Sequence, residues 1–94
     1  MLFATFICMR IELKKQFLKR YAKLSASLRS QCDERLELFG VEPNHPLLHN
    51  HALQGDRAGQ WSINITGDWR ALYEFGDSAT IIFVDIDMHS NLYR

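Results

Sequence analysis

Residues 60–75, QWSINITGDWRALYEF, contain the pattern that decides the fold. Over residues 61–65, apolar and polar side chains alternate, which is the period of a half-buried β-strand. Residues 66–68 are Thr-Gly-Asp and predict a turn, because glycine supplies the backbone angles of a tight turn and aspartate can hydrogen-bond within it. Residues 69–75 are again rich in strand formers. The stretch therefore predicts two strands folded back on each other.

Further strands are predicted on both sides of this hairpin. A third strand is expected over residues 80–86, and a short strand over residues 9–13. Residues 41–59 contain both prolines and three of the four histidines, and they predict a loop because proline interrupts regular structure. Residues 89–94 form a short tail after the last strand.

Two helices are predicted between the first strand and the loop. The first is expected over residues 14–29, where apolar side chains recur at spacings of four, three and four and make one stripe. The stripe consists of Phe17, Tyr21, Leu24 and Leu28. Ser30 with Asp33 three residues later is similar to a capping box, which places the start of a second helix near Gln31. Gly40 is a natural end for that helix.

The order β-α-α-β-β-β defines an α+β protein with one domain over residues 1–94. Ninety-four residues, of which 47% are hydrophobic, suffice for one modest core. Short connections favour an antiparallel meander, and with the first strand the sheet has about four strands, with both helices over one face. The first strand is expected to pair with the last, because the helices provide the crossover.

Charge is distributed unevenly along the chain although the formal net charge is zero. Residues 10–29 contain seven basic residues and one acidic residue, which gives +6, and residues 30–94 contain four arginines and ten acidic residues, which gives −6. The basic residues are Arg10, Lys14, Lys15, Lys19, Arg20, Lys23 and Arg29. Such a segment is either a surface for phosphate or an acidic partner, or a solvated helix face.

The two cysteines and the first eight residues indicate in which cellular compartment the protein is expected. Cys8 and Cys32 have no metal-binding spacing and make no disulfide framework, so we expect a reducing, intracellular environment. Residues 1–8 are apolar but too short to span a bilayer, and they lack the features of a signal peptide. We interpret them as a buried strand or as an extension before a domain that begins at Met9.

Eight residues are candidates for chemistry. They are His45, His49 and His51 in the loop, Asp68, Trp69 and Arg70 at the hairpin, and His89 and Tyr93 in the tail. Histidine exchanges a proton near pH 7 without a large pKa shift. Two histidines near an arginine suit phosphodiester cleavage through the 2′-hydroxyl, with one group as base, one as acid and the arginine beside the phosphorane. This chemistry requires no metal or other cofactor.

Each of these residues also has a structural interpretation. A histidine beside Pro46 or Asn50 often caps a turn, and His89 would then only fix the tail. Arg70 would be a surface residue paired with Glu74 or an aspartate. Trp61 lies on the face of Ile63 and belongs to the core by its spacing.

Two other chemistries are weighed against acid–base catalysis. The four histidines His45, His49, His51 and His89 would converge in a metal site, although the segment has few acidic or thiolate ligands at metal-like spacing. A Cys-His nucleophile pair would need a reactive thiol, but Cys8 lies in an apolar run and Cys32 in a predicted helix, where a buried inert thiol is usual.

The C-terminal half resembles the RelE superfamily of type II toxins, most closely its YafQ-like branch. The motifs that carry the resemblance are His45-Pro46-Leu47, Asn50-His51-Ala52-Leu53-Gln54-Gly55, Trp61-Ser62-Ile63, Gly67-Asp68-Trp69-Arg70 with Tyr73, and Ile86-Asp87-Met88-His89-Ser90-Asn91-Leu92-Tyr93. The N-terminal half agrees more loosely, through Phe17-Leu18-Lys19-Arg20. Met9 would be the usual start of the family domain.

The resemblance implies a curled antiparallel sheet and a cytoplasmic, ribosome-dependent endoribonuclease that cuts mRNA and is neutralised by a cognate antitoxin. Its implied site is His51, Asp68, Arg70, His89 and Tyr93. His89 is the first choice for general acid, His51 or Asp68 for base, and Arg70 for stabilising the phosphorane.

The implied RNA contacts come from two parts of the chain. Trp69 and Tyr93 would hold the nucleotide by stacking, which is typically worth ~1–3 kcal/mol for each base. Since phosphate neutralisation is the main source of nucleic-acid affinity, the basic segment would face the RNA. Its contacts would come from Lys15, Lys19, Arg20 and Lys23.

One position departs from the YafQ-like pattern. Asn64 stands where that branch has a further histidine, five residues before the hairpin tryptophan. Asparagine cannot exchange a proton, so one acid–base candidate is lost. The alternative function is therefore a catalytically degenerate protein of the same fold that retains only antitoxin binding.

Overall fold

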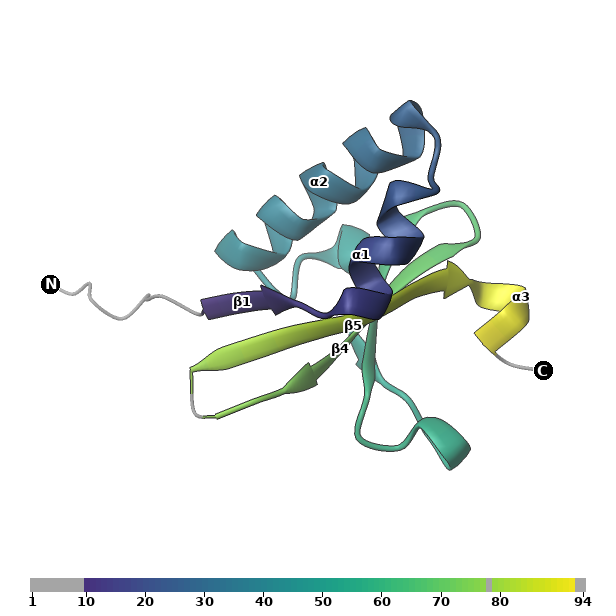
Figure 1. Cartoon of the computed structure of the whole chain (residues 1–94). Coiled ribbons are helices and arrows are strands. Elements are labelled where there is room, and N and C mark those ends of the chain that lie inside the picture. The colour runs from purple at the N-terminus through teal and green to yellow at the C-terminus, as the bar shows by residue number, and fades with distance from the viewer. Residues whose placement is uncertain (1–9, 78, 93–94) are drawn as a thin grey trace, which may run out of the picture.

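The computed structural model describes residues 10–77 and 79–92. Two helices lie on one side of a five-stranded sheet (Figure 1). The α-helices and the longer strands are β1 (Arg10–Leu13), α1 (Lys15–Ala22), α2 (Ala26–Val41), β3 (Trp61–Thr66), β4 (Trp69–Phe75), β5 (Thr80–Met88) and α3 (His89–Leu92). The α+β class and the helices over one face are confirmed. Residues 1–9 and Tyr93, to which predictions were attached, lie outside the described residues.

The strands are ordered β1-β5-β4-β3-β2, where β2 is the two-residue strand His51–Ala52. The predicted hairpin is confirmed, because β3 and β4 pair antiparallel with Ile63 opposite Ala71, and β4 pairs antiparallel with β5. The predicted pairing of the first and last strands is also confirmed, and it is parallel, with Ile11 opposite Ile81. The fifth strand is β2 (His51–Ala52), which adds an edge beside β3 and was not predicted.

The helix boundaries differ from the prediction. The single helix expected over residues 14–29 is wrong, since α1 ends at Ala22 and α2 begins at Ala26. Ser25, not Ser30, is the N-cap of α2, and its side chain accepts a hydrogen bond from the Leu28 amide at 3.1 Å. The apolar stripe continues across the break because both helices pack on the same core.

The core lies between the helices and the sheet. Phe17 of α1 and Phe39 of α2 both contact Phe83 of β5, with ring centroids 5.8 and 5.4 Å apart. Tyr73 of β4 completes the aromatic centre, 5.0 Å from Phe39. Cys32 is fully buried among these elements, and burial raises the pKa of its thiol to about 12, so it is the inert thiol expected of this position.

The segment from Val41 to Gly59 is more structured than the predicted loop. Val41 still belongs to α2, and the segment holds β2 and two short 3₁₀ helices, η2 (Pro46–Leu48) and η3 (Gly55–Arg57). Asn50 fixes it to the sheet, because its side chain accepts from the Tyr73 hydroxyl at 2.8 Å and donates to the Pro43 carbonyl at 3.1 Å. In the described part of the chain, no helix is long and apolar enough to cross a membrane.

Candidate functional site

The face of the sheet that the helices leave uncovered carries several of the predicted site residues. Strand register places Arg70 of β4 opposite Asn64 of β3 and Asp87 of β5. One row further on, Ser62 of β3 lies opposite His51 of β2. Directly paired residues and residues two apart on a strand project to the same face. Because Ile63, Ala71 and Ile86 face the core, these side chains all project to the opposite side, which we call the open face.

The hairpin turn and the C-terminal helix meet at the end of the open face. The His89 amide donates to the Asp68 carbonyl at 2.6 Å, and the His89 Nδ1 atom lies 4.0 Å from the Asp68 Oδ1 atom. The Ser90 hydroxyl donates to the other oxygen of Asp68 at 3.3 Å. Both Asp68 and His89 keep nearly half of their side-chain surface exposed, at 42% and 48%. Two predicted site residues, far apart in sequence, are thus adjacent and accessible.

Arg70 is held by backbone carbonyls. Its Nη1 atom donates to the carbonyls of Gly67 and Trp69, at 2.9 and 3.0 Å. Within residues 10–77 and 79–92 no ion pair joins Arg70 to a carboxylate, and Glu74, its suggested partner, instead accepts from Gln60 at 3.2 Å. The two carbonyls therefore orient the guanidinium, and no acidic side chain among the described residues neutralises its positive charge.

The loop histidines divide between structural and site roles. His45 caps η2, since its Nδ1 atom accepts from the Leu47 amide at 3.1 Å, as the turn-capping interpretation expects. His51 lies at the edge of the open face, its Nδ1 atom 2.8 Å from the His49 carbonyl oxygen. The rings of His49 and His51 are 4.8 Å apart. No group of three or more His, Cys, Asp or Glu side chains in the described residues could hold a metal ion, so the metal-site alternative has no ligand set there.

Asn64 and Ser62 place unsatisfied polar atoms beneath the open face. The Asn64 Oδ1 and Ser62 Oγ atoms are buried and have no hydrogen-bond partner among the described residues. Buried polar atoms are nearly always paired in proteins, and an unpaired one costs about 1–3 kcal/mol. Asn64 lies directly beside Arg70, so the unsatisfied acceptor belongs to the immediate surroundings of the predicted phosphate-stabilising group.

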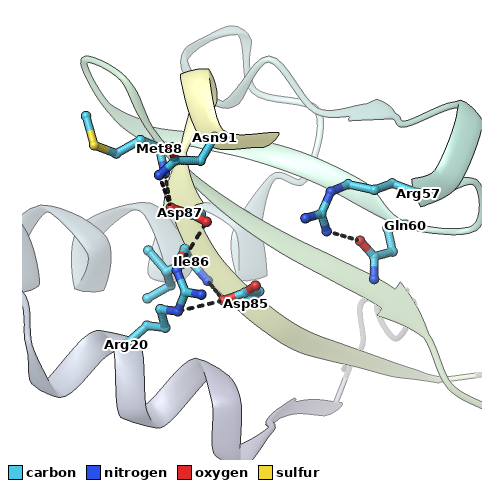
Figure 2. Close-up of polar contacts among 8 residues, drawn as sticks. All are labelled: Arg20, Arg57, Gln60, Asp85, Ile86, Asp87, Met88 and Asn91. Atoms are coloured by element: carbon cyan, nitrogen blue, oxygen red, sulfur yellow. Dashed lines mark hydrogen bonds and ion pairs between the residues drawn. The ribbon is translucent and has the colours of Figure 1, made fainter. Parts of the chain in front are cut away.

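The predicted RNA contacts on α1 are not equivalent. Lys15, Lys19 and Lys23 are exposed. Arg20 instead forms ion pairs with two carboxylates, at 3.6 Å to Asp85 and 3.1 Å to Asp87 (Figure 2). Trp69, predicted to stack on a base, is half-buried and packs against the core.

Asp87 is the residue of this region that sequence reasoning missed. Burial alone would raise the pKa of its carboxyl, but hydrogen bonds from the Asn91 side chain and the Met88 amide, together with Arg20, outweigh burial and lower the pKa. The available signal was the pair Asp85 and Asp87 at alternate positions of a strand, followed four residues later by Asn91.

A comparison with curated proteins finds Endoribonuclease HigB of Proteus vulgaris, which is 37% identical over 46 residues. That match covers 47% of this chain and 50% of the relative, so it spans about half the length of the curated protein. No family model matches the chain.

Two solved structures show how widely the architecture is shared. The YoeB/ParE toxin from Agrobacterium tumefaciens superposes with a TM-score of 0.71 at 21% identity, over 86% of this chain and 99% of that one. The E. coli DinJ-YafQ toxin-antitoxin complex contains a chain that superposes with a TM-score of 0.69 at 22% identity, over 93% of this chain and 100% of that one. The chain thus has the fold of the RelE-like toxins.

This fold places the predicted site residues in two groups. Asp68, Arg70 and His89 gather at the turn between β3 and β4, while His51 lies one row further along the open face. Such a surface offers a cation and two proton-exchanging groups around a shared solvent-exposed edge.

Proposed function

We propose that this chain is the toxin of a type II toxin–antitoxin pair and acts as a ribosome-dependent endoribonuclease that cleaves mRNA. The observation that carries the proposal is the juxtaposition of His89 with Asp68, only two residues from the carbonyl-held Arg70. An accessible imidazole, carboxylate and guanidinium are the groups that phosphodiester cleavage through the 2′-hydroxyl uses. The endoribonuclease named as a relative supports the same chemistry.

The reaction needs no metal in this mechanism. A base, His51 or Asp68, removes the proton from the 2′-oxygen, which attacks phosphorus and forms a phosphorane. Arg70 stabilises the added negative charge, and His89 protonates the departing 5′-oxygen, so that a 2′,3′-cyclic phosphate remains. Tyr93 holds the flanking nucleotide by stacking.

RNA affinity is assigned to the exposed lysines of α1. The chain has no net charge, so attraction to phosphate depends on where its cations lie. Lys15, Lys19 and Lys23 are exposed and carry the positive charge of the N-terminal segment toward solvent. These lysines would contact the RNA or the ribosome decoding site.

The same helix also provides a surface for the antitoxin. An open groove of about 530 Å³ is lined by Lys15, Leu18, Lys19 and Ala22, and Leu18 is 48% exposed within it. An acidic segment that folds on binding would bury Leu18 and neutralise the two lysines. The complex of a toxin of this fold with its antitoxin supports such a partner, and both proteins would act in the cytoplasm.

The second candidate is a degenerate toxin that only binds an antitoxin. The observation in its favour is Asn64, which puts an unpaired amide oxygen beside Arg70 where the YafQ-like branch has a histidine. Such a protein would keep the groove on α1 and lose cleavage.

Induced expression in bacterial cells separates the two candidates. We expect the wild type to arrest growth and to create new mRNA 5′ ends inside translated codons. His89→Ala should remove both effects, because the leaving oxygen then has no acid, while the purified variant keeps the wild-type circular dichroism spectrum. Normal growth and intact mRNA with folded wild-type protein would select the antitoxin-binding module. Unchanged arrest by His89→Ala would remove His89 from the mechanism.

A further inference from the structure

Arg20 reaches around the free edge of the sheet to the open face. β1 pairs with β5 only as far as Phe83, so beyond that point β5 has no neighbouring strand on this side. The Arg20 Nη1 atom lies 3.5 Å from the Ile86 carbonyl oxygen, at this edge. The same guanidinium is 3.6 Å from Asp85 and 3.1 Å from Asp87. Arg20 thus contacts one carbonyl and two carboxylates of a single strand.

Asp87 links Arg20 to the C-terminal helix. One oxygen of Asp87 faces Arg20, and the other accepts hydrogen bonds from the Met88 amide at 2.8 Å and the Asn91 side chain at 2.9 Å. Figure 2 shows Arg20 on one side of Asp87 and Asn91 on the other. Because Asn91 belongs to α3, the contacts run from α1 through β5 to α3.

The helix α3 depends on such contacts for its position. It has only four residues, too few to be stable as an isolated helix, and it begins at His89. Within the part of the chain that the structure describes, Asp68 contacts the start of this helix and Asp87 contacts Asn91 in its last turn. Losing the contact between Asp87 and Asn91 would remove one anchor of the helix on β5.

Charge argues against a phosphate contact for Arg20. Together Arg20, Asp85 and Asp87 carry one net negative charge, so this cluster does not attract RNA. The exposed lysines of α1 differ in this respect, since in the described part of the chain none of Lys15, Lys19 and Lys23 forms an ion pair.

We propose that Arg20 is a positioning residue, which holds Asp87 and through it fixes α3 and the His89 side chain next to Asp68. The inference rests on the proposed function where it concerns catalysis. Its structural part, the linkage of α1 to α3, stands apart from any activity.

Two variants test the linkage of α1 to α3, one that removes a charge and one that does not. Arg20→Gln removes a cation, whereas Asn91→Ala removes only the hydrogen bond from Asp87 to α3. We expect both to speed hydrogen exchange at the Met88 and His89 amides about tenfold, the effect of losing one charge-assisted hydrogen bond. The double variant should be no faster than the faster single variant, because both act on one chain of contacts. Lys19→Gln, which removes the same charge from the neighbouring position, should leave this exchange unchanged.

Cleavage kinetics on programmed ribosomes supply the second readout. Arg20→Gln and Asn91→Ala should each lower kcat about tenfold with little change in KM, since a displaced acid affects the chemical step. Arg20→Lys should restore kcat only in part, because an ammonium cannot contact Asp85, Asp87 and the Ile86 carbonyl together.

The exchange and cleavage measurements test the linkage of α1 to α3 and the proposed nuclease activity separately. Hydrogen exchange at the wild-type rate in both variants would overturn the linkage of α1 to α3. A raised KM in Arg20→Gln, with unchanged kinetics in Asn91→Ala, would instead show that Arg20 contacts the RNA. A wild type without cleavage would refute the nuclease, while the exchange measurement would still decide the linkage.

Discussion

At the scale of the residue, Arg70 is the side chain whose geometry bears most directly on the proposed cleavage. Two carbonyls of its own turn orient the guanidinium and leave it without a carboxylate partner among the described residues. We expect Arg70→Ala to reduce mRNA cleavage about 10²–10³-fold, the usual effect of removing one group that stabilises transition-state charge. Antitoxin binding, measured by co-purification, should change little, because the α1 groove lies elsewhere.

Arg35 offers the matched control for that experiment. It lies on α2, and its side chain reaches the Leu47 carbonyl at 3.4 Å, away from the open face. Arg35→Ala removes the same charge and should keep cleavage. Equal loss of cleavage and antitoxin binding in Arg70→Ala would show that Arg70 is a structural residue.

At the scale of the element, the cap of α2 explains why the second helix was predicted to begin near Gln31 and not at Ala26, where it begins. The hydrophobic stripe from Phe17 to Leu28 has helical spacing throughout, and spacing alone gives no sign that the chain turns after Ala22. The local signal is Ser25, but Ser30 with Asp33 offered a similar motif five residues later. Strand predictions were more accurate, because alternation, turn glycine and strand length agree in residues 61–75.

The competing caps lead to a stability prediction for α2. Ser25→Ala should lower the free energy of unfolding by about 1 kcal/mol, because the Leu28 amide loses its acceptor. Ser30 lies at an exposed position inside the helix, so Ser30→Ala should leave the free energy of unfolding unchanged or raise it slightly. Urea denaturation followed by circular dichroism measures both. A larger loss for Ser30→Ala would place the helix start where the sequence motif suggested.

At the scale of the whole molecule, the site depends on contacts that local sequence does not encode. Asp68 and His89 meet because β5 returns beside β4, and this much follows from the predicted meander. Arg20 and Ile86 are 66 residues apart, and their contact depends on where β1 ends and how α1 crosses the sheet edge. The open face could thus be predicted in outline, whereas the partner of each charge on it could not.

Two carboxylates with lowered pKa values contribute to the acid stability of the molecule. The pKa of Asp87 is lowered in the folded protein, because hydrogen bonds from Asn91 and Met88 and the charge of Arg20 outweigh burial. The pKa of Asp77 is lowered too, mainly by the hydrogen bond from Thr80. A carboxylate with a lowered folded pKa stabilises the fold above its unfolded pKa of about 3.9 and loses that contribution as pH falls through the folded value.

Wild-type stability should therefore decline as pH drops below about 4, and the decline should be shallower in Asp87→Asn. At neutral pH this variant should lose up to about 1 kcal/mol, since Arg20 is partly exposed and its ion pair is screened. Asp56→Asn, at an exposed position of η3, is the matched control for a charge change outside the linkage. Urea midpoints between pH 2.5 and 7 measure these slopes. Parallel plots of urea midpoint against pH for wild type and Asp87→Asn would mean that Asp87 binds its proton equally in the folded and unfolded states. The contacts from Arg20 and Asn91 would then contribute nothing to the acid stability of the fold.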